Sequence, residues 1–152
     1  MRRQRTTGGR AVQGVVLAHN AAMTEPDLPV LDAEGLRRFA AVQPQQPCAA
    51  CAAIRAPGWE AVPGSLARDR LRKVATLRQP EVEDPTLEEF HPQGTHGWSP
   101  HAPIAPGFFP YNRCDVWQCV QCARAFLRYT EYGGYYVEER IRELQTELIV
   151  AD

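Results

Sequence analysis

Two CxxC motifs constrain the fold of this chain more than any other feature of its sequence. "PCAAC" contains Cys48 and Cys51, and "QCVQC" contains Cys119 and Cys122. A two-residue spacer lets a tight turn bring two sulfurs to one point, and two such turns supply the four thiolates of a closed tetrahedral zinc site. The intervening 67 residues do not exclude a shared site, because loop-closure entropy grows slowly with loop length. The sequence therefore predicts one structural zinc ion bound by Cys48, Cys51, Cys119 and Cys122.

Other uses of these thiols stay open at this point. A redox-active dithiol needs its CxxC at the start of a helix, and "PCAACAAIR" makes Cys48 and Cys51 the better redox candidates. Unliganded thiols are a second alternative. The fifth cysteine, Cys114, fits a buried apolar residue, although it could also replace a ligand. Three histidines of the proline-rich segment are further replacement candidates: His91, His96 and His101.

The segment "VWQCVQCARAF" resembles the zinc knuckle of zinc-ribbon proteins, in which a strand enters the CxxC turn and a second strand returns. The resemblance implies metal ligation by the same four cysteines. Rubredoxins hold iron in a similar knuckle, so iron is the alternative metal. Such knuckles usually have glycine after the second cysteine, where the backbone turns left-handed. Here Ala52 and Ala123 occupy those positions, and alanine adopts that conformation at a cost of about 1–2 kcal/mol.

Local patterns predict three helices and one hairpin. Asp32 is a good N-cap for a helix over "AEGLRRFAAV", and Ser65 can cap a second helix over "LARDRLRKVATLR". Strands from Asp115 into the second CxxC and through "ARAFLRYTEY" lead to a two-residue Gly-Gly turn. A C-terminal amphipathic helix is predicted from apolar residues spaced i, i+4, i+7 and i+11: Val137, Ile141, Leu144 and Leu148.

Residues 79–113 hold seven prolines and have no sustained periodicity, yet they are too aromatic for a disordered linker. We expect an ordered, irregular segment that covers the rest of the fold. The predicted class is α+β: a small zinc-ribbon-like hairpin packed against a C-terminal helix, with this long irregular Pro/aromatic-rich segment. Residues 1–30 are expected to be a disordered leader, with Met23 as an alternative start, and residues 31–152 a single zinc-stabilised domain.

Composition narrows the function classes. The net charge is −1, which does not suit a protein that wraps nucleic acid, and no apolar run reaches the roughly 20 residues of a membrane helix. The apolar stretch "AVQGVVLA" is short, so we expect no secretory signal and a cytoplasmic location. Five cysteines in such a chain indicate metal binding rather than a disulfide framework.

The expected function is a non-enzymatic binding or adaptor module for a protein partner, because four thiolates leave no open metal position. Tyrosine and arginine are typical of binding hot spots. The predicted contact residues are Trp98, Tyr111, Arg128, Tyr132 and Tyr135. One alternative is a nucleic-acid-binding zinc ribbon that uses the basic residues of 65–78. Another is a rubredoxin-like electron carrier or an enzyme with a Cys/His zinc site.

Overall fold

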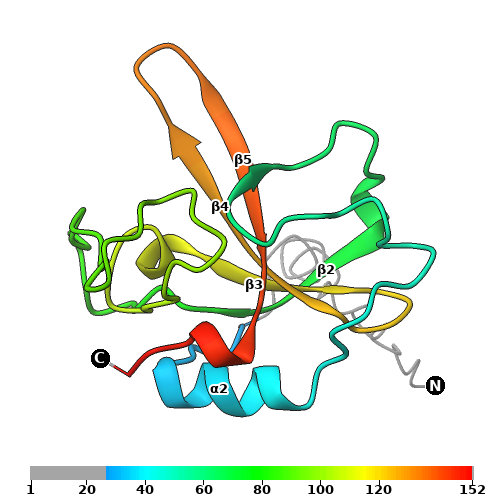
Figure 1. The fold of residues 1–152 in the computed structure, drawn as a ribbon, viewed down its shortest axis with the longest axis horizontal. Coiled ribbons are helices and arrows are strands. Elements are labelled where there is room, and N and C mark those ends of the chain that lie inside the picture. The colour runs from blue at the N-terminus through cyan, green and yellow to red at the C-terminus, as the bar shows by residue number, and fades with distance from the viewer. Residues whose placement is uncertain (1–26, 152) are drawn as a thin grey trace, which may run out of the picture.

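The computed structural model describes residues 27–151, and these form one antiparallel sheet with a single α-helix at its end (Figure 1). The strands are β1 (Glu60–Ala61), β2 (Leu71–Thr76), β3 (Asp115–Cys119), β4 (Ala125–Tyr132) and β5 (Val137–Glu143). Their order across the sheet is β1-β5-β4-β3-β2. The α2 helix is Ala33–Ala41, and three short 3-10 turns complete the set: η1 (Arg68–Arg70), η2 (Tyr111–Arg113) and η3 (Thr146–Leu148).

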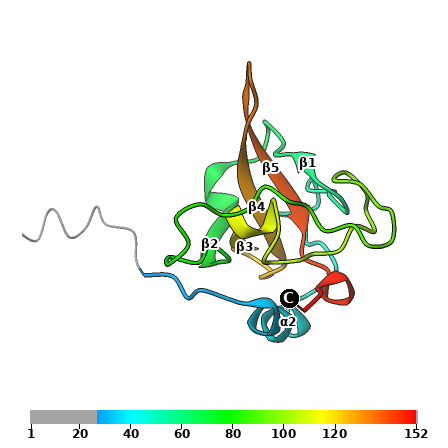
Figure 2. The ribbon, with the colours of Figure 1, turned by 90° about the vertical axis from the view of Figure 1, so that its left-hand side faces the viewer.

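The first predicted helix is confirmed. Asp32 caps α2 by accepting a 2.7 Å hydrogen bond from the backbone N–H of Gly35. The helix packs against the sheet through Leu36 and Ala40, and it lies beside η3 at one end of the molecule (Figure 2). Arg37 fixes this arrangement by donating to the carbonyl of Ile149 from two of its nitrogens, at 3.2 and 2.9 Å.

The predicted C-terminal helix is wrong, and with it the packing of a zinc-ribbon-like hairpin against such a helix. Residues 137–143 form β5, which pairs with β4 along its whole length, from Tyr132 opposite Val137 to Phe126 opposite Glu143. The apolar spacing indicated one face of a helix, but these residues lie on both sides of the sheet. Ile141 packs on one face and Leu144 on the other. The chain reverses direction after Gly133, so β5 pairs with β4. This antiparallel pairing supplies the backbone hydrogen bonds that a helix would otherwise provide.

The predicted second helix is also wrong. Only Arg68–Arg70 makes a helical turn, and the chain then continues as β2. A β-bulge between Lys73 and Ala75 shifts the register by one residue. Leu71 and Ala75 therefore face opposite sides of the sheet despite their helix-like i, i+4 spacing.

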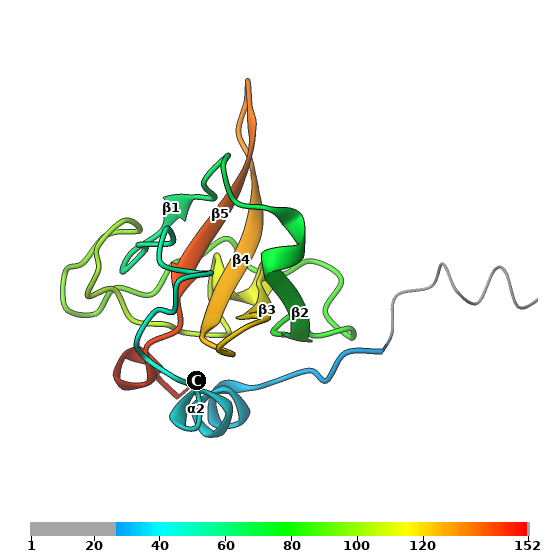
Figure 3. The same cartoon turned by 90° about the vertical axis from the view of Figure 1, so that its right-hand side faces the viewer.

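The β4–β5 hairpin projects well beyond the rest of the molecule (Figures 1 and 3). Its loop has four residues, 133–136, rather than the predicted two, and the N–H of Gly133 donates to the carbonyl of Tyr136 at 2.8 Å. A Cβ atom at Gly133 would lie 2.4 Å from the Tyr136 ring, so a larger residue there would require that ring to move.

Side chains on the two faces of the sheet form two cores. The larger core includes Leu36, Leu77, Val116 and Leu127, and it is covered by α2 and by the proline-rich residues 79–113. The second core consists of Leu71, Phe126 and Ile141 together with the cysteine turns. This second core places the CxxC motifs against the sheet.

Residues 79–113 contribute no strand to the sheet, and Ile104 forms an isolated bridge with Ile149. Of the expected leader, residues 1–26 lie outside the described part of the chain. Residues 29–31 run beside β2, where Thr76 donates to Pro29 and accepts from Leu31.

Candidate metal centre

Two tight turns from distant parts of the sequence deliver the four cysteines. In the first turn the N–H of Cys51 donates to the carbonyl of Cys48 at 3.2 Å. The second turn connects β3 to β4, and the N–H of Ala123 donates to the carbonyl of Cys119 at 2.9 Å. Pairing of β3 with β4 fixes the second turn, and the second core, which includes both Ile54 and Phe126, brings the first turn to it.

The four sulfur atoms have the spacing of a tetrahedral metal site. The Sγ of Cys48 lies 3.8 Å from that of Cys51 and 3.6 Å from that of Cys119, and Cys51 and Cys122 are 3.7 Å apart. All four sulfurs lie within 4.8 Å of one another. Four sulfurs about 2.3 Å from a tetrahedral ion stand about 3.8 Å apart. The four predicted cysteines are therefore together and could hold a metal ion.

The thiol environment also suits a cation. Burial opposes ionisation of Cys48, but hydrogen bonds from the N–H groups of Cys51 and Ala50 and from neighbouring thiols lower its pKa to about 6. Burial, together with hydrogen bonds to the thiolate of Cys48, raises the pKa of Cys122 to about 11. Closely packed thiols cannot all ionise by themselves, whereas a cation at their centre stabilises four thiolates together.

Arg124 is a residue beside the candidate metal site that the sequence analysis did not assign. Its side chain is buried, with Nη1 3.9 Å from the Sγ of Cys51 and 3.4 Å from the carbonyl of Ile54. The guanidinium also forms an ion pair with Glu143 of β5. Four thiolates and a divalent ion carry a net charge of −2, so this arginine offsets part of the negative charge beside the site.

The left-handed position of the knuckle is present in the second turn. Ala123 has φ of 68°, and among the described non-glycine residues it is the one with positive φ, so Ala52 does not share this conformation. We expect Ala123→Gly to raise the free energy of unfolding by about 1 kcal/mol, because glycine removes the left-handed penalty. Ala52→Gly is the matched control and should be neutral or destabilising. Chemical denaturation of the unmodified protein and of the two variants measures their free energies of unfolding. Equal effects of glycine at both positions would contradict a left-handed penalty specific to Ala123.

The alternative metal ligands considered above, Cys114 and the three histidines, are not part of the four-cysteine cluster. Cys114 is fully buried in the larger core, where its thiol donates to the carbonyl of Pro110 at 3.2 Å and burial raises its pKa. His91 contacts Thr95 and Glu89, His96 accepts from the N–H of Trp98, and His101 is exposed. The candidate metal group among the described residues comprises the four CxxC cysteines.

The five predicted contact residues are distributed over three environments. Tyr132 and Tyr135 stand at the hairpin tip with exposed fractions of 77% and 104%. Trp98 is 52% exposed on the proline-rich segment, under the guanidinium of Arg140. Arg128 is half-buried on β4, and Tyr111 lies in the larger core. The hairpin tyrosines and Trp98 thus form the exposed part of this set.

Arg142 is a further residue that sequence reasoning missed. On the predicted C-terminal helix this residue would be exposed, but it is the largest fully buried side chain of the described residues. Its guanidinium donates to three backbone carbonyls and to the hydroxyl of Tyr111. The carbonyls belong to Pro57, Pro100 and Ala102, so Arg142 ties the irregular segments to the sheet.

Comparison with protein-family models, with curated proteins and with solved structures found no match to the chain. The resemblance to zinc ribbons therefore rests on the two CxxC turns alone. Within residues 27–151, no helix is both long and apolar enough to cross a membrane.

Proposed function

We propose that this chain is a structural-zinc protein that acts as a non-enzymatic binding module for a protein partner. The observation that carries the proposal is the closed set of four sulfurs within 4.8 Å of one another. Four thiolates complete a tetrahedral shell and leave no position for water or substrate, which is the arrangement of structural rather than catalytic zinc. The burial of Cys51 and Cys119 at the base of the second core supports a role in holding the fold together.

The β4–β5 hairpin is the proposed contact element. Besides Tyr132 and Tyr135, its tip exposes Tyr136 and Val137, and the hairpin stands clear of the body of the molecule (Figure 1). Exposed clusters of large apolar side chains are typical of protein interaction sites. Tyrosine suits such sites because its ring buries a large area at a low cost in conformational entropy.

Replacing both tip tyrosines tests this contact. We expect the Tyr132→Ser/Tyr135→Ser double variant to weaken partner binding more than tenfold, since each hot-spot side chain contributes more than about 1 kcal/mol. Affinity purification of the full chain with quantitative mass spectrometry gives the partner, and titration of that partner gives the affinity. The control is Val42→Ser/Leu87→Ser, which changes two exposed apolar residues away from the hairpin. Unchanged binding by the hairpin variant would remove the hairpin from the proposal.

A further inference from the structure

The β4 strand is longer than its neighbour β3, and this leaves part of a sheet edge open. The pairing of β3 with β4 ends where Asp115 lies opposite Arg128. β4 continues through residues 129–132, and within the described part of the chain these pair with a strand on one side alone, with β5. This open edge belongs to the hairpin that projects from the molecule (Figures 1 and 3).

The alternation of backbone groups along β4 shows what the open edge presents. The N–H of Cys119 donates to the carbonyl of Arg124 at 2.9 Å, so even-numbered residues direct their backbone groups to the β3 side. The N–H of Gly133 donates across the hairpin, so odd-numbered residues direct theirs to β5. Thr130 and Tyr132 therefore present their N–H and C=O groups at the open edge. Among residues 27–151, no backbone hydrogen bond is made to these groups from that side.

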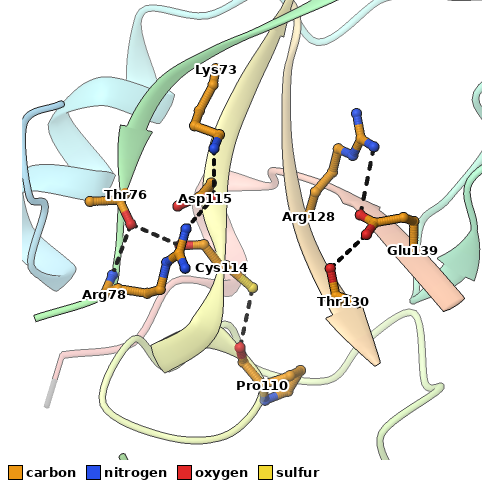
Figure 4. Close-up of polar contacts among 9 residues, drawn as sticks. All are labelled: Lys73, Thr76, Arg78, Pro110, Cys114, Asp115, Arg128, Thr130 and Glu139. Carbon is orange, nitrogen blue, oxygen red and sulfur yellow. Dashed lines mark hydrogen bonds and ion pairs between the residues drawn. The ribbon is translucent and has the colours of Figure 1, made fainter. Parts of the chain in front are cut away.

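The polar side chains near this edge make their contacts with β5. The hydroxyl of Thr130 donates to one oxygen of Glu139 at 2.6 Å, and Arg128 lies 3.7 Å from the other oxygen of that carboxylate (Figure 4). These side chains thus leave the backbone groups of the open edge without a partner.

The space beside the open edge is hollow. A cavity of about 610 Å³ is lined by Thr130 and Tyr132 and also by Asn112 and Arg113, which precede β3 in the chain. A strand placed there would continue the line of β3. Both acidic and basic side chains line the cavity, so the unpaired backbone groups are the feature of this edge that selects a ligand.

The two outermost strands of the sheet are protected against the addition of a further strand, as is usual in natural sheets. β1 has only two residues, β2 has the bulge between Lys73 and Ala75, and residues 29–31 cover the end of β2. The open part of β4 has no proline and no bulge, and its register with β5 is regular up to Tyr132 opposite Val137. An edge without such protection is suited to pairing with another strand.

The charges beside the open edge favour a basic residue on an added strand. Glu131 lies opposite Glu138 of β5, and Arg140 lies 3.7 Å from the first carboxylate and 3.1 Å from the second. A lysine or arginine on the free side of Glu131 would add a cation to this row, because directly opposed residues of opposite charge attract. Two copies of this chain paired through Thr130 and Tyr132 would instead place their Glu131 residues opposite each other. These charges favour a different chain as the partner.

We infer that the open edge of β4 binds an extended peptide segment of a partner protein, antiparallel to β4, with a basic residue opposite Glu131. The residues on either side of that basic residue pair with Thr130 and Tyr132 through backbone hydrogen bonds. In such strand addition the main chain provides affinity, and alternate side chains provide specificity. The inference rests on the proposed function, because it states how the hairpin contacts its partner.

Amide hydrogen exchange of the full-length, metal-loaded protein tests the inference. The probe is the peptide acetyl-Thr-Val-Lys-Val-Thr-amide, whose valines pair with Thr130 and Tyr132. We expect these two amides to exchange rapidly in the free protein and about tenfold or more slowly at saturating peptide. The amide of Glu131, which faces β5, should be protected in both states. Protection of Thr130 and Tyr132 without peptide would mean that the chain itself or a second copy occupies the edge, and would overturn the inference.

Modified peptides separate strand pairing from other modes of binding. N-methylation of both valines removes the donors to β4 and should lower the affinity about tenfold or more. N-methylation of the lysine is the matched control and should change little, because its N–H points away from β4. Equal affinities of these peptides would exclude strand addition. Glutamate in place of lysine should weaken binding about threefold or more, and an unchanged affinity would overturn the choice of a basic residue.

A proline in β4 distinguishes a failure of this inference from a failure of the proposed function. Thr130→Pro removes an N–H at the open edge, not one bonded to β5, and should abolish peptide binding. Thr130→Ala loses the same hydroxyl and should retain binding. Equal binding by both variants would overturn strand addition, and the proposed function would still stand if Tyr132→Ser/Tyr135→Ser weakened binding of the purified partner. The modified peptides keep the test valid if Thr130→Pro is unstable.

Discussion

Stripping the metal ion is expected to abolish the cooperative fold of residues 27–151. Structural zinc contributes an apparent free energy of about 10–16 kcal/mol, whereas the whole free energy of unfolding of an ordinary domain is about 5–15 kcal/mol. The cysteine turns also carry the second core, so their release exposes Leu71, Phe126 and Ile141 to water. Far-UV circular dichroism during titration with a strong chelator measures the loss of the sheet. The signal should return when zinc is added back.

Two cysteine variants provide the control for this experiment. Cys51→Ser removes a fully buried sulfur of the cluster and should behave as the stripped protein does. Cys114→Ala removes a thiol from the larger core, outside the cluster, and should keep both the metal and the cooperative transition. A stripped protein that melts as the metal-loaded one does would contradict a structural role of the ion.

Replacing Arg142 by methionine is expected to lower the free energy of unfolding by about 3–5 kcal/mol. The substitution removes the donors to the carbonyls of Pro57, Pro100 and Ala102. A hydrogen bond from a charged group contributes about 1.5–3 kcal/mol, and carbonyls left without partners inside the protein add a desolvation cost. These terms are not additive, so we expect less than their sum.

Denaturant titration of the metal-loaded protein measures the effect of Arg142→Met. The matched control is Arg38→Met on α2, where the side chain is 75% exposed and pairs with Glu34 one turn away. An exposed pair of this kind contributes about 0.3–0.5 kcal/mol, so the control should change little. Similar values for the two variants would mean that Arg142 does not anchor the irregular segments.

The cysteine cluster could be predicted from the sequence because its signal is local. Each CxxC spacer already requires a turn that brings two sulfurs together, and metal chemistry favours joining two such turns. Asp32 was equally informative, since a capping side chain acts on the backbone three residues away. Neither prediction needed knowledge of the sheet.

The strands β2 and β5 could not be predicted in this way. The spacing of Leu71 and Ala75 matches one helix face, but the β-bulge in β2 sends these side chains to opposite cores. Ile141 of β5 and Leu144, which directly follows that strand, likewise pack on different faces. A sheet buried on both sides removes the simple alternation that distinguishes a strand from a helix.

The contacts of Arg142 depend on long-range packing. The carbonyl groups that bind Arg142 lie at least 40 residues away in the sequence, and no local pattern marks them. Such residues are recognised only when the burial and the partners of each charged side chain are known.

Metal analysis of the purified full-length protein tests most directly whether one ion joins the two CxxC turns. Elemental analysis should find one zinc ion per chain, and a thiol reagent that modifies four cysteines should release that ion in a single step. Iron at the same stoichiometry would contradict the assignment of zinc. A protein that is folded without any bound metal would contradict the central claim.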